Sequence, residues 1–245
     1  MNADWLYPMR KQDSTAKTLV FLGDSITASG EYIRFIEACL QRQRGTLRAE
    51  LLGRGVPSET ASGLSEAAHP FPRPCIHDRL NQVLESSDPW MVVACYGMND
   101  GIYHPFSEER FDAYQEGIRR LVAEIRNKGA ISVLMTPPPF DPESMNATLQ
   151  PGDAPNFSYL EPYQGYDGVL KLYSEWLLSE RPADDIIDIR SPLIEHIRSK
   201  RSHGRVYSSG DGIHPNREGH RIIAQTILKK LFGLSLDLAN MPDIG

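Results

Sequence analysis

Four short motifs, far apart in the chain, together supply the groups needed to hydrolyse an ester through an acyl-enzyme. In chain order they are Gly23-Asp24-Ser25-Ile26-Thr27, Gly53-Arg54-Gly55, Gly97-Met98-Asn99-Asp100 and Asp211-Gly212-Ile213-His214. They contain a serine nucleophile, three candidate hydrogen-bond donors for an oxyanion, and a histidine with a carboxylate partner. Each motif alone is weak evidence, because the same residues are common in helix caps and turns. All four in this order predict a serine esterase.

The first and last motifs carry the predicted nucleophile and its base. Ser25 follows a buried apolar run at 18–22 and is expected near a helix N-terminus, where free N–H groups favour a developing anion. His214 can take the serine proton near neutral pH, and Asp211 would fix the histidine tautomer and stabilise the imidazolium. The alternatives are a plain helix cap at Asp24 and Ser25, and a surface turn at 211–214.

The second and third motifs carry the other expected donors. Asn99 comes just after the apolar run 90–95, so its side-chain amide could face a substrate oxygen at the end of a strand. One such donor is worth roughly 2.7–4 kcal/mol in a transition state. The backbone N–H of Gly55 could serve in the same way, because no side chain blocks close approach. An Asx turn at Asn99 and a routine glycine after a strand are the alternatives.

Hydrophobic patterning predicts the elements that must position these groups. Strands are expected at 18–22, 47–52, 90–95, 131–135 and 186–189, and helices at 31–44, 76–84, 108–127, 167–178, 193–200 and 217–232. Strands that alternate with helices predict an α/β fold with a parallel sheet covered on both faces. Since no repeat or low-complexity linker divides the chain, we expect one domain over 1–245, with 1–17 as an N-terminal extension.

The segment 137–166 breaks this rhythm. It is rich in proline, has little periodicity, and follows the fourth predicted strand. Long loops in compact domains are usually functional or disordered, and the carboxyl edge of a parallel sheet carries the ligand crevice. We therefore expect an active-site wall or lid, the alternative being a solvated insertion. Asp24, Tyr103 and His104 lie in or near the motifs and are expected to line the substrate.

Composition excludes several other classes of protein. The chain has 245 residues, a net charge of -6 and three cysteines. Mild acidity argues against nucleic acid as a partner, and the cysteines indicate neither a disulfide framework nor a zinc site. No run approaches the roughly 20 apolar residues of a membrane span. The absence of a secretory leader in 1–17 predicts a cytoplasmic protein, the alternative being a secreted one whose leader has been removed. The sequence does not predict an oligomeric state.

The motifs resemble those of the GDSL, or SGNH, family of serine hydrolases, over 23–214. The first, third and last match closely, with Ile26 in place of the leucine of the family name. The second is looser, because Gly53 stands where many members carry asparagine. The resemblance implies a five-stranded parallel sheet in a flavodoxin-like three-layer α/β/α sandwich, with no metal or cofactor. It also implies Ser25 as nucleophile, Asp211 and His214 as its partners, and Ser25 N–H, Gly55 N–H and the Asn99 side chain as oxyanion donors.

The resemblance leaves the substrate open among lipid esters, thioesters and acetyl groups on sugars. Aromatic and amide side chains gather in the segment after the fourth strand: Asn146, Asn156, Tyr159, Tyr163, Gln164 and Tyr166. Such side chains suit a hydroxyl-rich ligand through stacking and hydrogen bonds. The hypothesis is therefore a carbohydrate O-acetylesterase. The alternatives are a lysophospholipase or acyl thioesterase and, from another class, a non-catalytic glycan-binding module.

Overall fold

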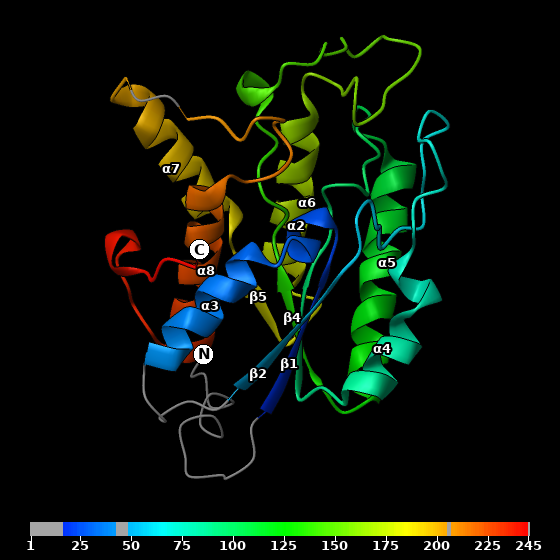
Figure 1. The fold of residues 1–245 in the computed structure, drawn as a ribbon. Coiled ribbons are helices and arrows are strands. Elements are labelled where there is room, and N and C mark those ends of the chain that lie inside the picture. The colour runs from blue at the N-terminus through cyan, green and yellow to red at the C-terminus, as the bar shows by residue number, and fades with distance from the viewer. Residues whose placement is uncertain (1–16, 43–48, 205–206, 245) are drawn as a thin grey trace.

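The computed structural model describes residues 17–42, 49–204 and 207–244, and contains a five-stranded, all-parallel sheet (Figure 1). The strands lie in the order β2-β1-β3-β4-β5. Their bounds are β1 Lys17–Gly23, β2 Ala49–Gly55, β3 Met91–Cys95, β4 Ile131–Met135 and β5 Asp185–Ile187. The predicted parallel sheet is confirmed. The expected N-terminal extension lies outside the described residues, except for Lys17, which begins β1.

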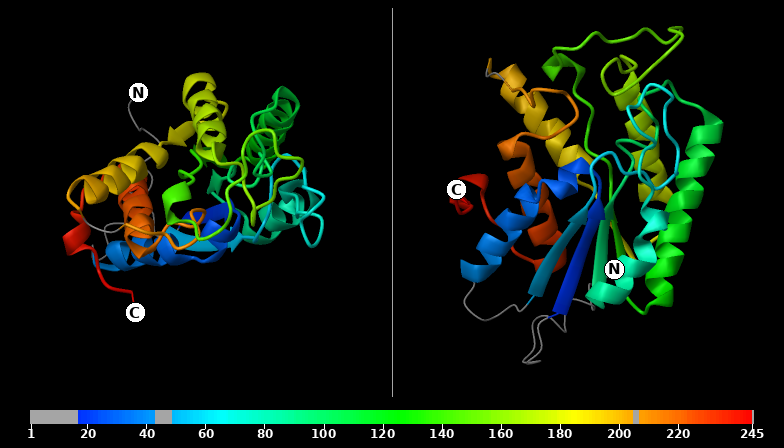
Figure 2. Two further views of the ribbon diagram at one scale, coloured as in Figure 1. Left: turned by 90° about the horizontal axis from the view of Figure 1, so that it is seen from above. Right: turned by 45° about the vertical axis from the view of Figure 1, so that its right-hand side comes forward.

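Helices cover both faces of the sheet and make the expected three layers (Figure 2). One face packs on α4 Leu80–Ser87, α5 Glu108–Asn127 and α6 Tyr166–Glu180, and the other on α3 Glu31–Arg42, α7 Arg190–Ser202 and α8 Arg217–Phe232. Side chains of a strand alternate between faces, so Val92 and Ala94 of β3 enter the first cluster and Val93 the second. Every residue of β3 is buried, as a strand between two helical layers requires.

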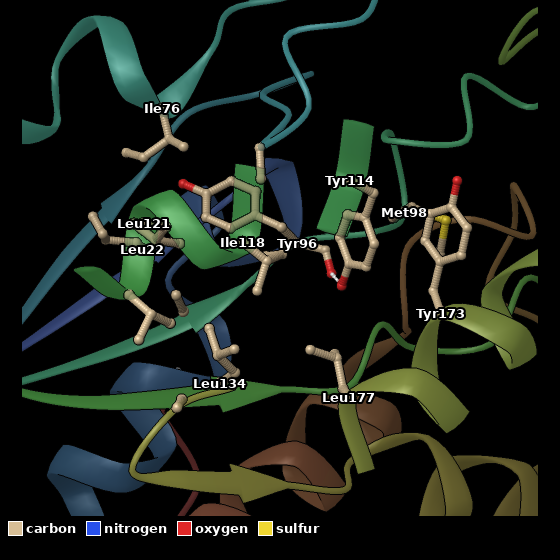
Figure 3. Close-up of a cluster of buried hydrophobic side chains, with 14 of the residues drawn as sticks. Leu22, Ile76, Tyr96, Met98, Tyr114, Ile118, Leu121, Leu134, Tyr173 and Leu177 are labelled. Carbon is tan, nitrogen blue, oxygen red and sulfur yellow. Dashed lines mark hydrogen bonds between the residues drawn. The ribbon is translucent and has the colours of Figure 1, made fainter. Parts of the chain in front are cut away.

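The first cluster shows why the long helix α5 forms where the pattern predicted it. Figure 3 shows Tyr114, Ile118 and Leu121 of α5 packed against the sheet and α6. These positions recur at three and four residues and are at most 1% exposed. Ser107 caps the helix by accepting a hydrogen bond from Arg110 N at 3.4 Å. The Tyr114 hydroxyl donates to the backbone oxygen of Tyr96, the residue that follows β3.

Several element boundaries differ from the prediction, and the structure gives a physical reason for two of them. β2 continues through the glycines of the second motif, because Gly23 pairs with Gly55 at the end of the β1–β2 ladder. Gly55 therefore ends a strand instead of following one. Helix α7 starts at Arg190 instead of 193, since Thr136 Oγ1 accepts hydrogen bonds from Ile189 N and Arg190 N, both at 3.0 Å. The predicted residues 43–44 and 47–48 lie outside the described residues.

The motifs after β1 and β3, and the end of β2, meet at the carboxyl edge of the sheet, where the segment 137–166 also emerges (Figure 1). This follows from the parallel topology, which brings all carboxyl ends of the strands to one edge. None of the described helices is long and apolar enough to cross a bilayer.

Candidate active site

Ser25 begins the short helix α2, Ser25–Ala28, immediately after β1. Asp24 caps this helix, because its Oδ1 accepts a hydrogen bond from Ile26 N at 2.9 Å. The turn requires glycine at position 23: φ is 157°, and a Cβ there would lie 2.9 Å from Cys95 O. The chain therefore turns sharply from strand into helix and leaves the Ser25 side chain half-buried at the sheet edge.

Ser25, His214 and Asp211 form a continuous hydrogen-bonded chain. Ser25 Oγ lies 2.7 Å from His214 Nε2, and His214 Nδ1 lies 2.5 Å from Asp211 Oδ2. The other oxygen of Asp211 accepts hydrogen bonds from Ile213 N and His214 N, at 2.9 and 2.8 Å. Asp211 thus fixes both the ring and the backbone of the loop that carries His214. This arrangement suits transfer of the serine proton to Nε2 of a histidine whose Nδ1–H is held by a carboxylate.

Electrostatics in this group favour a basic histidine. The hydrogen bond to Asp211 raises the pKa of His214 against the effect of burial, and the negative charges of Asp211 and Asp24 add to the increase. Burial raises the pKa of Asp211, but the hydrogen bonds from His214 and Ile213 outweigh it and hold the pKa below the usual value. Burial raises the pKa of Asp24 to about 6, opposed by the Ile26 hydrogen bond and the His214 charge.

The loop that carries His214 is fastened to the beginning of the segment 137–166. Asp141 N donates to Gly212 O at 2.8 Å, and Arg201 of α7 donates to both carboxylate oxygens of Asp141 at 2.9 Å. Gly212 has a φ of 72°, and a Cβ there would lie 2.5 Å from Asp141 O. The beginning of the segment 137–166 is therefore joined to the loop that carries His214.

Two of the expected oxyanion donors lie at the same edge, Gly55 at the end of β2 and Asn99 in the loop after β3. Gly55 packs directly on the backbone of α2, because a Cβ there would overlap Ala28 N and lie 2.7 Å from Thr27 C. The Asn99 side chain is 5% exposed and donates from Nδ2 to Glu59 O at 3.2 Å. The Gly55 contact brings the end of β2 against the turn that carries Ser25, and the Asn99 hydrogen bond joins the loop after β3 to the loop after β2.

Buried ionic groups connect these loops, and sequence reasoning did not find them. Asp100 is fully buried, and its Oδ1 accepts hydrogen bonds from Ala61 N and Ser62 N, both at 2.8 Å. Glu59 is also fully buried, and its carboxylate accepts two hydrogen bonds from Arg79 and one from Tyr96, all at 2.6 Å. In a sequence, a buried charged residue cannot be distinguished from an ordinary surface charge. Only Asp100 was singled out, because it belongs to the third motif.

The three residues expected to line the substrate have different environments. Asp24 and Tyr103 are 4% and 1% exposed. The Asp24 carboxylate accepts a hydrogen bond from Ile26 N, and the Tyr103 hydroxyl donates one to Asn99 Oδ1. His104 is partly exposed, and its ring lies 5.0 Å from that of Phe157 in the segment 137–166. Burial and the charge of Arg110 lower the pKa of His104. Of the three, His104 is the one with accessible surface for a ligand.

Within the described ranges, no group of three or more histidine, cysteine, aspartate and glutamate side chains is placed to hold a metal ion.

Comparison with known structures finds the same fold in esterases. A variant of the acetyl xylan esterase Axe2 from Geobacillus stearothermophilus superposes with a TM-score of 0.66 at 19% identity, covering 91% of this chain and 97% of that one. The acetyl xylan esterase AlAXEase gives 0.64 at 20% identity, covering 87% and 98%. BT4096, described as a gut microbial diltiazem-metabolizing enzyme, gives 0.64 at 21% identity, covering 89% and 47%.

Sequence comparison identifies the family. No curated protein matches the sequence. The model of the GDSL-like lipase/acylhydrolase family matches residues 21–222, which is most of the chain and includes all four motifs. The chain therefore belongs to the GDSL-like lipase/acylhydrolase family and is a carboxylic ester hydrolase.

Proposed function

We propose that this protein is a carbohydrate O-acetylesterase that works through an acyl-enzyme on Ser25. The observation that carries the proposal is the hydrogen-bonded chain from Ser25 Oγ through His214 to Asp211, with both links at 2.7 Å or less. Nucleophile, base and orienting carboxylate at hydrogen-bond distance are the arrangement that activates a serine hydroxyl.

The reaction then has two halves. His214 Nε2 takes the Ser25 proton while Oγ bonds to the acyl carbon, and the carbonyl electron pair moves to oxygen. The oxyanion accepts hydrogen bonds from Ser25 N, Gly55 N and Asn99 Nδ2. Collapse breaks the bond to the alcohol, whose oxygen receives the proton from His214. Water then gives a proton to His214, attacks the acyl carbon, and releases acetate as the proton returns to Ser25.

Two observations support a sugar as the alcohol. The solved structures with the same fold include proteins described as acetyl xylan esterases. Loops at the carboxyl edge also present aromatic side chains, since the His69 ring lies 4.6 Å from Phe71 and 5.5 Å from Tyr159, and Phe71 is 52% exposed. Tyr166, one of the side chains that suggested a sugar, is fully buried and does not contribute to such a surface.

The test compares p-nitrophenyl acetate, butyrate and octanoate with acetylated xylo-oligosaccharides, using wild type and Ser25→Ala. We expect turnover that falls with acyl length, acetate release from the oligosaccharides, and loss of both in Ser25→Ala. Turnover that rises with acyl length would instead support the lysophospholipase or thioesterase alternative. Sugar binding by a folded wild type without turnover would support the binding module.

A further inference from the structure

The orientation of the Asn99 amide decides whether this residue can serve an oxyanion. Its nitrogen end donates and its oxygen end repels negative charge, and the two ends differ by a half-turn of the side chain. In the structure Nδ2 donates to Glu59 O at 3.2 Å. A primary amide nitrogen carries two N–H groups, so this bond leaves the other for a ligand oxygen.

The oxygen end of the same amide is held by Tyr103. The Tyr103 hydroxyl donates to Asn99 Oδ1 at 3.0 Å, four residues along the chain. The side chain is 1% exposed, and burial raises the pKa of Tyr103, so the hydroxyl stays protonated and available as a donor. Glu59 and Tyr103 thus hold opposite ends of the amide, and reversing the amide would place two carbonyl oxygens against each other.

The Tyr103 ring is itself held by two neighbouring side chains. It stacks on Tyr166 with centroids 4.9 Å apart, and the Arg73 guanidinium carbon lies 5.4 Å from its centroid. Arg73 is in turn paired through two bonds of 2.6 Å with Glu66, and both side chains are 1% exposed. A buried ion pair joined by two hydrogen bonds has a defined geometry, so Glu66 holds the Arg73 guanidinium in one position beside the Tyr103 ring.

The backbone of this loop is held in an uncommon conformation. Ile102 and Tyr103 have φ of 45° and 60°, in the left-handed region that residues other than glycine rarely adopt. The turn is closed by Ile102 N donating to Asn99 O at 3.0 Å, and Tyr163 N donates to Tyr103 O at 2.9 Å. Strain of this kind persists where surrounding contacts require it and is concentrated at functional sites.

We propose that Tyr103 is a positioning residue for the oxyanion hole: its hydroxyl holds Asn99 Oδ1 so that Asn99 Nδ2 faces the substrate oxygen. The inference rests on the proposed esterase function and on the role of Asn99 in it. Tyr103 acts through Asn99, since its own side chain is buried and its hydroxyl is bonded to that amide.

The test is a double-mutant cycle with p-nitrophenyl acetate, because a cycle separates an effect that passes through Asn99 from a general effect on the fold. Tyr103→Phe removes only the hydroxyl and keeps the stacked ring. We expect kcat to fall about 3- to 10-fold, as for loss of one neutral hydrogen bond, with KM nearly unchanged. In the Asn99→Ala background, adding Tyr103→Phe should change kcat by less than about twofold.

Tyr114→Phe is the matched control. It also removes one hydroxyl from a fully buried tyrosine, and that hydroxyl bonds to Tyr96 O instead of to Asn99 (Figure 3). We expect this variant to shift the melting temperature about as much as Tyr103→Phe, with wild-type kcat.

The outcomes separate this inference from the proposed function. Equal losses from Tyr103→Phe in both backgrounds, or no loss in wild type, would overturn the positioning role while the esterase function stands. Wild-type kcat in Asn99→Ala would overturn the roles of Asn99 and Tyr103 together. Full activity in Ser25→Ala would overturn the proposed function itself.

Discussion

Ser25 Oγ and His214 Nε2 lie 2.7 Å apart although 189 positions separate the two residues in the chain. The packing of α8 on α3 makes this possible. His220 of α8 stacks on Tyr32 of α3 with centroids 6.2 Å apart, and the loop before α8 then ends beside the turn after β1. The Tyr32 hydroxyl shares a hydrogen bond with Thr27 Oγ1 of α2 at 3.0 Å, so a line of contacts runs from α8, the helix that follows His214, to α2, the helix that begins at Ser25.

The activity should depend on pH through His214. The base must be neutral, so kcat/KM falls as pH falls through the pKa of His214, which Asp211 raises. We therefore expect the acidic limb of the profile above pH 6.5, the ordinary value for histidine. Asp211→Asn removes the negative charge, which lowers that pKa, so the limb should move to lower pH. The plateau should also fall by on the order of 10²- to 10⁴-fold, because the amide no longer fixes the tautomer. If the acidic limb of Asp211→Asn lay at the same pH as that of wild type, Asp211 would not be the group that raises the pKa of His214.

Asn99→Ala should lower kcat on p-nitrophenyl acetate by about 10²- to 10³-fold, the loss usual for one oxyanion donor. KM should change little, because the interaction forms in the transition state. Steady-state kinetics measure both constants, and the melting temperature controls for loss of the bond to Glu59 O. A raised KM with wild-type kcat would assign Asn99 to ground-state binding.

Gly55→Ala should destabilise the protein and impair catalysis together. The added Cβ would overlap Ala28 N, and backbone on both sides leaves no flexible group to move aside. Overpacking of this kind costs about 1–3 kcal/mol. Gly168→Ala is the matched control, since nothing lies within 4 Å of a Cβ there and α6 should gain about 0.5–1 kcal/mol. Chemical denaturation measures both changes. A free energy of unfolding for Gly55→Ala equal to that of wild type would show that β2 can move away from α2.

Asp100→Ala should destabilise the loops more than Asp100→Asn. Alanine leaves Ala61 N and Ser62 N without their acceptor, at about 1–3 kcal/mol for each unsatisfied group. Asparagine keeps an oxygen at the Oδ1 position. Burial raises the pKa of Asp100, which means that the folded protein disfavours the negative charge, so replacing the carboxylate by a neutral amide should cost little. Denaturant midpoints of the two variants test this order, and a reversed order would mean that the charge is the essential property.

Much of the fold could be predicted because its signals are local. The buried run that forms β3 and the apolar face of α5 are visible within a few residues of sequence, and both elements form as predicted. The motifs were recognisable for the same reason, since each sits beside a strand end. The end of β2 was missed because its extension to Gly55 depends on pairing with Gly23, a residue 32 positions away.

The surroundings of Asn99 could not be predicted, because they depend on contacts between distant segments. Tyr103 was expected to line the substrate because it follows the third motif, and Tyr166 because it lies in a polar and aromatic segment. They are buried against each other and against Arg73, whose charge is compensated by Glu66. No local pattern distinguishes a buried ion pair from two surface charges, since the distinction lies in how the loop folds back.

Whether Ser25 is the nucleophile can be measured by reacting the protein with a serine-directed phosphonate and mapping the label by peptide mass spectrometry. We expect one phosphonyl group per chain, located on Ser25, with esterase activity lost in proportion to labelling. Ser25→Ala should remain unlabelled, and Ser29→Ala, a nearby exposed serine, should label as wild type does. A label on another residue, or full activity in fully labelled protein, would mean that Ser25 is not the nucleophile.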